Sequence, residues 1–133
     1  MRNLLKDKIR TSHDSFSILK EIWDDNKINI LEQFKVLLLN RANKVIGVYE
    51  ASSGGITGTI ADSRLILATA IKSLAVSIIL SHNHPSGNLK PSRADEELTS
   101  RIKSACQYHD IKVLDHVIVT SEGYYSFADE GLI

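Results

Sequence analysis

The stretch ILSHNHPSGNLKPSRADEEL, residues 79–98, carries the chain from a strand through a tight loop into a helix. The run VSIIL (76–80) that leads into it is unbroken and apolar, which is typical of a buried central strand. Pro85 and Gly87 then predict a turn. From residue 92 to about residue 108 the apolar positions recur with helical period. This order of elements favours a fold that mixes strands with helices.

The rest of the chain extends the same pattern on both sides. Helical periodicity predicts helices over residues 12–26 and 63–74, with Ser12 or Asp14 as the cap of the first. The predicted strands occupy residues 33–40, 44–50, 56–60 (ITGTI), 111–119 and 124–127. Hairpin-length links occur beside strand–helix–strand segments, so we expect an α/β single domain in which a mixed β-sheet is packed with helices.

Composition narrows the class of protein. A length of 133 residues suits one domain, and 16 basic residues balance 16 acidic ones. Zero net charge argues against broad electrostatic binding to nucleic acid or to an anionic membrane. Cys106 is the only cysteine, so an internal disulfide is impossible. The N-terminal sequence MRNLLKDKIR lacks the apolar run of a signal peptide, and we expect a cytoplasmic protein without a membrane segment.

The two histidines of the stretch predict a metal site. His82 and His84 are two apart at a strand end, so in extended chain they point to the same face while Asn83 points away. The loop can return the chain so that Asp95, one turn inside the next helix, completes a His-His-Asp set. Three protein ligands and one open position are the arrangement of a catalytic zinc site. Glu50, at the end of the strand KVIGVYE, is a candidate general base.

Structural explanations exist for the same residues. A lone H-x-H pattern is weak, and Ser92-x-x-Asp95 also has the form of a helix capping box. Glu50 at a strand end is more often a solvated charge. The letters HNH also occur in the name of a nuclease class, but those nucleases take their residues from separated segments. The residues alone therefore leave the capping and metal-binding explanations open.

The whole set Glu50…His82-x-His84-Pro85…Ser92-x-x-Asp95 resembles the JAMM (JAB1/MPN) metalloprotease signature. The segments SHNHPSGNLKPSRADEELTSRI, VLDHVIV and YYSFADEGLI are similar to the bacterial RadC family, labelled DNA repair proteins, over roughly residues 33–133. The resemblance implies a cytidine-deaminase-like MPN (JAB1) fold, with residues 1–30 as an N-terminal helical extension and residues 31–133 as the RadC-like domain.

The family resemblance also implies roles for the residues of the site. His82, His84 and Asp95 would bind Zn²⁺, Glu50 would deprotonate the attacking water, and Ser92 would donate a hydrogen bond to the developing oxyanion. The leading hypothesis is a zinc-dependent metallopeptidase or isopeptidase-like hydrolase of an unidentified peptide or protein. The alternatives are a DNA-repair-associated protein and a noncatalytic MPN interaction module. The helix-hairpin-helix segment of longer RadC members is not found here, so we expect at most weak nucleic-acid binding.

The pair Asp115-His116 in the strand VLDHVIV adds one open question. In a strand the two side chains point to opposite faces, so only one of them can approach the site. We expect His116 or Asp115 to be either a buried, hydrogen-bonded core residue or a partner of a metal ligand.

Overall fold

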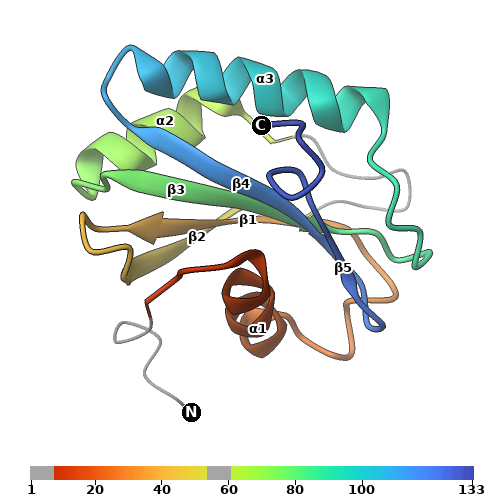
Figure 1. The fold of residues 1–133 in the computed structure, drawn as a ribbon. Coiled ribbons are helices and arrows are strands. Elements are labelled where there is room, and N and C mark those ends of the chain that lie inside the picture. The colour runs from red at the N-terminus through yellow and green to blue at the C-terminus, as the bar shows by residue number, and fades with distance from the viewer. Residues whose placement is uncertain (1–7, 54–60) are drawn as a thin grey trace.

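A computed structural model describes residues 8–53 and 61–133 of the chain. The predicted strand at residues 56–60 lies outside the described residues. Within them, helices and strands follow one another as in Figure 1: α1 (Ser12–Ile22), β1 (Gln33–Leu39), β2 (Val45–Ser53), α2 (Ser63–Lys72), β3 (Ser77–Asn83), α3 (Arg93–Gln107), β4 (Lys112–Val119) and β5 (Tyr124–Ser126).

The described strands form one mixed sheet in the order β2-β1-β3-β4-β5. β1 pairs antiparallel with both β2 and β3, and β4 pairs antiparallel with β5. β3 and β4 are parallel, because α3 carries the chain back between them. The predicted α/β fold with a mixed sheet is confirmed.

Helices cover the two faces of this sheet. α2 and α3 lie on one face and α1 lies on the other (Figure 1). The residues of β1 and β3 are buried on both faces, which explains the apolar runs VLLL (36–39) in β1 and IIL (78–80) in β3. Alternate residues enter different cores: Val36 and Leu80 pack toward α2 and α3, while Leu37 and Ile79 pack toward α1.

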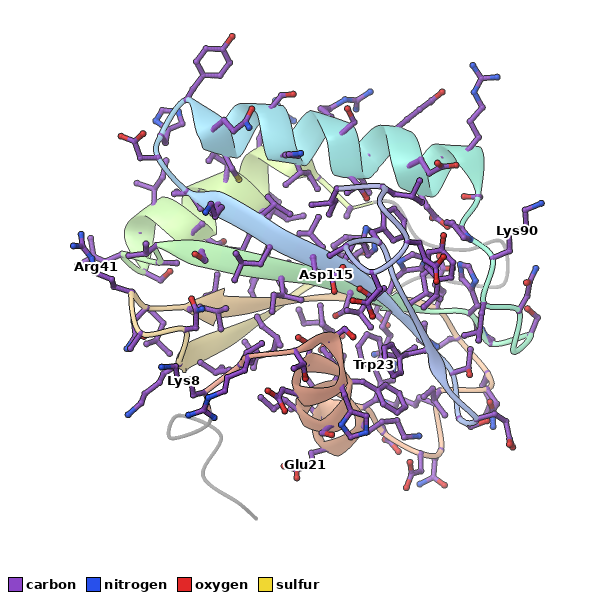
Figure 2. All side chains as sticks on the ribbon, in the orientation of Figure 1. Lys8, Glu21, Trp23, Arg41, Lys90 and Asp115 are labelled. Atoms are coloured by element: carbon purple, nitrogen blue, oxygen red, sulfur yellow. The ribbon has the colours of Figure 1, made fainter. Side chains whose placement is uncertain are left out.

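α1 shares a core with the sheet. Leu19 and Trp23 are buried in the same apolar cluster as Leu37 of β1, and Trp23 lies on the α1 side of the sheet in Figure 2. The division of the chain at residue 30 stays a prediction, and α1 packs on the sheet as one of its covering helices.

Two details of α1 differ from the sequence prediction. Its cap is Thr11, because the Thr11 hydroxyl accepts a hydrogen bond from the backbone N–H of Asp14 and the Asp14 carboxylate accepts one from Thr11 in return. The prediction of Ser12 or Asp14 as the cap was wrong. Ser12 is the first residue of the helix, and Asp14 is the other member of the capping box that Thr11 begins. α1 also ends at Ile22 rather than at residue 26.

The ends of two strands bear on the site. β2 continues to Ser53, three residues beyond Glu50, and β3 continues through His82 to Asn83. In the antiparallel pairing of β1 with β3, Phe34 is the partner of His82. The start of β1 therefore lies beside the end of β3.

No helix among residues 8–53 and 61–133 is both long enough and apolar enough to cross a membrane.

Candidate metal centre

His82 and His84 bring two ring nitrogens together at the end of β3. Their Nε2 atoms are 2.9 Å apart, and the side chain of His82 is almost fully buried while that of His84 is partly exposed. The backbone N–H of His84 donates to the carbonyl of Val119, so the extended conformation continues one residue beyond β3. The same-face arrangement expected from the H-x-H spacing is observed.

The loop after His84 is built to turn sharply. Gly87 has φ of 85°, a conformation that favours glycine, and its N–H donates to the carbonyl of His84. The ring nitrogen Nδ1 of His84 lies 2.6 Å from the carbonyl oxygen of Asn88. Lys90 points away from the molecule on this loop (Figure 2). The loop therefore holds the His84 ring and returns the chain to the start of α3.

Asp95 faces both histidines from the first turn of α3. Its Oδ2 atom is 3.4 Å from Nε2 of His82 and 3.4 Å from Nε2 of His84. The same Oδ2 accepts a 2.8 Å hydrogen bond from the N–H of Ser92, whose hydroxyl accepts one from the N–H of Asp95. The capping explanation and the metal explanation thus apply to the same carboxylate.

The separations of these three atoms fit a tetrahedral ion. With bonds of about 2.0–2.1 Å, two ligands of a tetrahedral zinc lie roughly 3.3 Å apart. The two distances from Asp95 match this value, and the distance between the nitrogens of His82 and His84 is shorter by a few tenths of an ångström.

The hydrogen bonds of the rings leave electron pairs facing one another. A carbonyl oxygen only accepts, so Nδ1 of His84 donates its N–H to Asn88 and the neutral ring keeps a bare Nε2. That Nε2 of His84 faces Nε2 of His82 and Oδ2 of Asp95. The pKa of His84 is raised, chiefly by its hydrogen bond to Asp95, and burial opposes this only in part. A cluster of acceptors of this kind binds a cation, either a proton or a metal.

The charge of Asp95 is favoured by the same contacts. Burial alone would raise the pKa of this carboxyl. When the rings of His82 and His84 are protonated, their Nε2–H groups can donate to this carboxylate, and these contacts outweigh burial and hold the pKa of Asp95 well below its usual range. An ionised carboxylate beside two imidazoles is the donor set that zinc prefers for a catalytic site.

Glu32 is a residue of the site that the sequence prediction missed. Glu32, His82 and His84 each present one potential ligand atom, and these three atoms lie within 4.8 Å of one another. Because Phe34 pairs with His82 in antiparallel register, the residue two before Phe34 comes beside the residue two after His82. The signal was a carboxylate placed directly before an apolar strand, but its use requires the register of two strands far apart in sequence.

The structure does not bring Glu50 to these histidines. Glu50 is exposed and pairs with Lys35, and its Oε1 accepts a 3.2 Å hydrogen bond from Gln33. The amine of Lys35 donates to the carbonyl of Ile22 at the end of α1, so this pair lies on the α1 face of the sheet. His82 pairs with Phe34, which packs in the α2–α3 core on the opposite face. Side chains alternate along a strand, so a sequence position alone did not tell the face.

Ser92 lies beside the ligand cluster as the N-cap of α3. Its hydroxyl oxygen accepts a 3.0 Å hydrogen bond from the N–H of Asp95, and the residue is exposed. A hydroxyl that accepts through its oxygen still has one proton to donate. The structure therefore places Ser92 where both of its proposed roles are possible.

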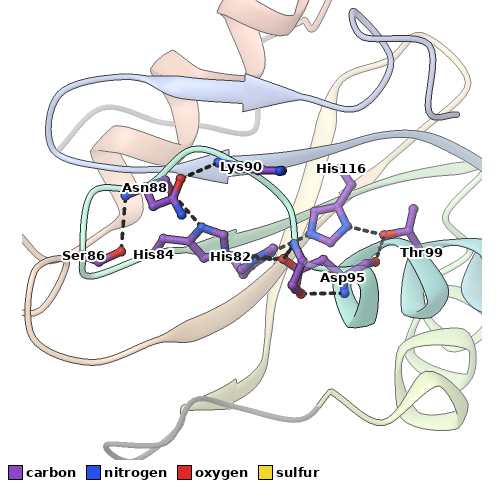
Figure 3. A network of polar contacts seen from close by, with 9 residues as sticks. His82, His84, Ser86, Asn88, Lys90, Asp95, Thr99 and His116 are labelled. Carbon is purple, nitrogen blue, oxygen red and sulfur yellow. Dashed lines mark hydrogen bonds and ion pairs between the residues drawn. The ribbon is translucent and has the colours of Figure 1, made fainter.

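His116 and Asp115 point to opposite faces, as predicted for neighbours in a strand. His116 is fully buried, and its Nε2 lies 2.7 Å from Nδ1 of His82 (Figure 3). Asp115 is turned away and accepts hydrogen bonds from the hydroxyl of Ser126 and the N–H of Ala128. His116 is thus a buried, hydrogen-bonded residue, and its partner is His82, a histidine of the site.

The family of the chain follows from sequence comparison. The RadC-like JAB domain family matches residues 9–132, which include every residue of the site described above.

This chain belongs to the RadC-like JAB domain family.

Its relatives include two proteins named UPF0758. One, from Flavobacterium johnsoniae, is 47% identical over 125 residues, which are 94% of this chain and 53% of the relative. The other, from Porphyromonas gingivalis, is 47% identical over 103 residues, which are 77% of this chain and 45% of the relative. The RadC-like chain thus spans about half the length of the curated relatives it matches. The predicted RadC membership is confirmed, and the mixed sheet with its covering helices is consistent with a JAB/MPN fold.

Proposed function

We propose that this RadC-like JAB domain is a zinc-dependent hydrolase that cleaves peptide or isopeptide bonds. The observation that carries the proposal is the convergence of three acceptor atoms, from His82, His84 and Asp95, with the carboxylate of Glu32 beside them. A noncatalytic scaffold has no need of such a cluster, since facing acceptors are costly to bury without a cation.

His82, His84 and Asp95 would hold the zinc ion. Either carboxylate, Asp95 or Glu32, could complete a three-ligand set with the two histidines. We assign Asp95, because its oxygen is equally distant from both nitrogens and is fixed by the N–H of Ser92. A zinc ion held by three protein ligands supplies Lewis-acid chemistry that activates water and polarises a carbonyl.

Glu32 takes the role of general base that the sequence prediction gave to Glu50. Its carboxylate lies on the same side of the sheet as the histidines and enters from the start of β1, whereas Asp95 enters from α3. A base that stands beside the ligands without being one of them can take a proton from the attacking water. Glu50 lies on the α1 face of the sheet, opposite to the face that carries the histidines.

Ser92 would stabilise the transition state with its remaining proton. The hydroxyl is exposed and adjacent to Asp95, so it can donate to the oxygen on which charge develops during attack on a carbonyl. Its hydrogen bond from the N–H of Asp95 fixes the oxygen in place, which keeps the donor oriented.

The substrate class is part of the proposal. The reaction class comes from the resemblance of His82-x-His84-Pro85…Ser92-x-x-Asp95 to the JAMM (JAB1/MPN) metalloprotease signature, and we propose a peptide or protein substrate. The net charge of zero does not favour the nucleic-acid alternative.

A cleavage screen tests this function. The protein is incubated with a peptide library, once with added zinc and once with a chelator, and products are detected by mass spectrometry. We expect cleavage that requires zinc and is absent in the Asp95→Asn variant, in which an amide oxygen can still cap α3. Cleavage by the chelated protein at the same rate would refute a metal-dependent mechanism.

A further inference from the structure

Two buried side chains outside the proposed catalytic set connect the ligands with each other. Nε2 of His116 lies 2.7 Å from Nδ1 of His82, and Nδ1 of His116 lies 2.5 Å from the hydroxyl of Thr99. The Thr99 hydroxyl in turn lies 2.7 Å from the backbone carbonyl oxygen of Asp95, to which it donates. Figure 3 shows this chain of contacts running from β3 through β4 to α3.

The positions of the protons follow from the last contact. A carbonyl oxygen can only accept, so the Thr99 hydroxyl donates its one proton to the backbone carbonyl oxygen of Asp95. Its oxygen must then accept from Nδ1–H of His116, which leaves Nε2 of a neutral His116 bare. A bare Nε2 accepts, so Nδ1 of His82 carries the proton. The lone pair of His82 is thereby on Nε2, the atom that faces His84 and Asp95.

The surroundings of His116 leave it no other polar partner for its ring among the described residues. Phe127 stacks on the ring with centroids 4.6 Å apart, and Phe34 contacts it edge-on at 5.4 Å. An apolar residue would pack in such a place without the cost of burying two ring nitrogens. The imidazole is therefore best explained by what its two nitrogens do at His82 and Thr99.

We propose that Thr99 and His116 are positioning residues that set the tautomer of His82 and so present its Nε2 lone pair to a metal ion. The inference rests on the proposed metal site. Thr99 directs the proton of His116, and His116 directs the proton of His82. Because Thr99 lies one turn after Asp95 on α3, the same contacts tie the ligand on β3 to the helix that carries the ligand carboxylate.

The Thr99→Val variant separates this role from simple packing. Valine keeps the shape of threonine but offers no oxygen to His116, which is then free to place its proton on Nε2. His82 would respond by carrying its proton on Nε2, where zinc must bind. Thr99→Ser, which keeps the hydroxyl, is the matched control.

The first measurement needs no metal. In zinc-free protein with ¹⁵N-labelled histidine at pH 8, the ¹⁵N shifts of wild type and Thr99→Ser should show His82 protonated at Nδ1, and those of Thr99→Val should show it protonated at Nε2. A His82 tautomer that is the same in all three proteins would overturn the inference.

The second measurement is zinc affinity by competition with a chelator dye. We expect Thr99→Val to bind zinc roughly 10–100-fold more weakly than Thr99→Ser, the usual cost of losing a partner of a ligand. Equal affinities would contradict the inference. If wild type itself binds no zinc, the proposed function fails, and the tautomer measurement still decides the role of Thr99.

A second pair of variants tests the proposal at His116, in case Thr99→Val does not fold. His116→Gln can place an amide oxygen where Nε2 stood and accept from Nδ1–H of His82, whereas His116→Leu cannot. We expect His116→Gln to keep the Nδ1–H tautomer of His82 and His116→Leu to lose it. The same tautomer in both variants would overturn the role of His116.

Discussion

Glu50 and His82 lie on opposite faces of the sheet, although only β1 separates the strands that carry them. Glu50 pairs with Lys35 on the α1 face, and His82 pairs with Phe34 on the face covered by α2 and α3. The sheet itself therefore stands between this carboxylate and the histidines. Glu32 lies with the histidines and Glu50 lies on the other face, so substitution of each gives a matched pair of variants.

Glu32→Gln should retain zinc and lose hydrolysis. The amide has nearly the shape of the carboxylate but cannot take a proton from water, and removal of a general base costs ~10²–10⁴-fold in rate. Glu50→Gln, the matched change on the other face, should keep turnover within about twofold, because it does not reach the reacting atoms. The check is the turnover of both variants on a peptide found in the cleavage screen. Normal turnover in Glu32→Gln would remove Glu32 from the mechanism.

Ser92→Ala separates the catalytic role of this residue from its capping role. Loss of an N-cap costs ~1 kcal/mol of unfolding free energy. Loss of an oxyanion donor lowers the rate by about 10²–10³-fold. We expect both effects in Ser92→Ala, with zinc content unchanged.

Thr11→Ala is the control for that variant. Thr11 caps α1 with the same type of capping box, but on the other face of the sheet. Denaturant unfolding should show a similar loss of stability in both variants, and turnover should fall only in Ser92→Ala. Equal turnover in the two would mean that Ser92 is only a cap.

The capping box of α1 also predicts a pH dependence of stability. Hydrogen bonds from the N–H groups of Arg10 and Thr11, the first being the larger effect, lower the pKa of Asp14 in the folded protein. A depressed folded pKa stabilises the fold above the unfolded value of about 3.9, and this contribution is lost as pH falls through the folded pKa. Wild type should thus exceed Asp14→Asn in unfolding free energy at pH 7, and the difference should shrink toward pH 2. A constant difference across this range would contradict the assignment.

Nucleic-acid binding should be weak and sensitive to salt. The chain has zero net charge, so few counterions would be released from DNA, and we expect a Kd in the ~10⁻⁴ M range or weaker at physiological salt. Fluorescence anisotropy with labelled single-stranded and double-stranded DNA measures this. Submicromolar affinity for either would support the DNA-repair alternative instead.

The sequence predicted those parts of the site that depend on local geometry. His82 and His84 share a face because they are two apart in extended chain, and the Ser92-x-x-Asp95 spacing predicted both the start of α3 and the return of a carboxylate. These relations need only the periods of a strand and a helix.

The parts that were missed depend on pairing between distant segments. Glu32 reaches the histidines through the antiparallel register of β1 with β3. Glu50 lies on the α1 face, and the sequence did not indicate this. The face on which a strand residue lies is set by its partner strand and its bulges, and the pairing of β2 with β1 has a shift of register near each end. The contact of His116 with His82 required the parallel pairing of β3 with β4.

The most direct test of the metal site is isothermal titration calorimetry, in which zinc is added to metal-free wild type, Asp95→Asn and Glu32→Gln. Asp95→Asn keeps a capping oxygen but loses the ligand charge, and Glu32→Gln keeps all three proposed ligands. We predict one zinc per chain in wild type and in Glu32→Gln, and loss of most of the affinity in Asp95→Asn. Zinc binding by Asp95→Asn that is as tight as that of wild type would contradict the site, and loss of zinc in Glu32→Gln alone would show that the ligand carboxylate is Glu32.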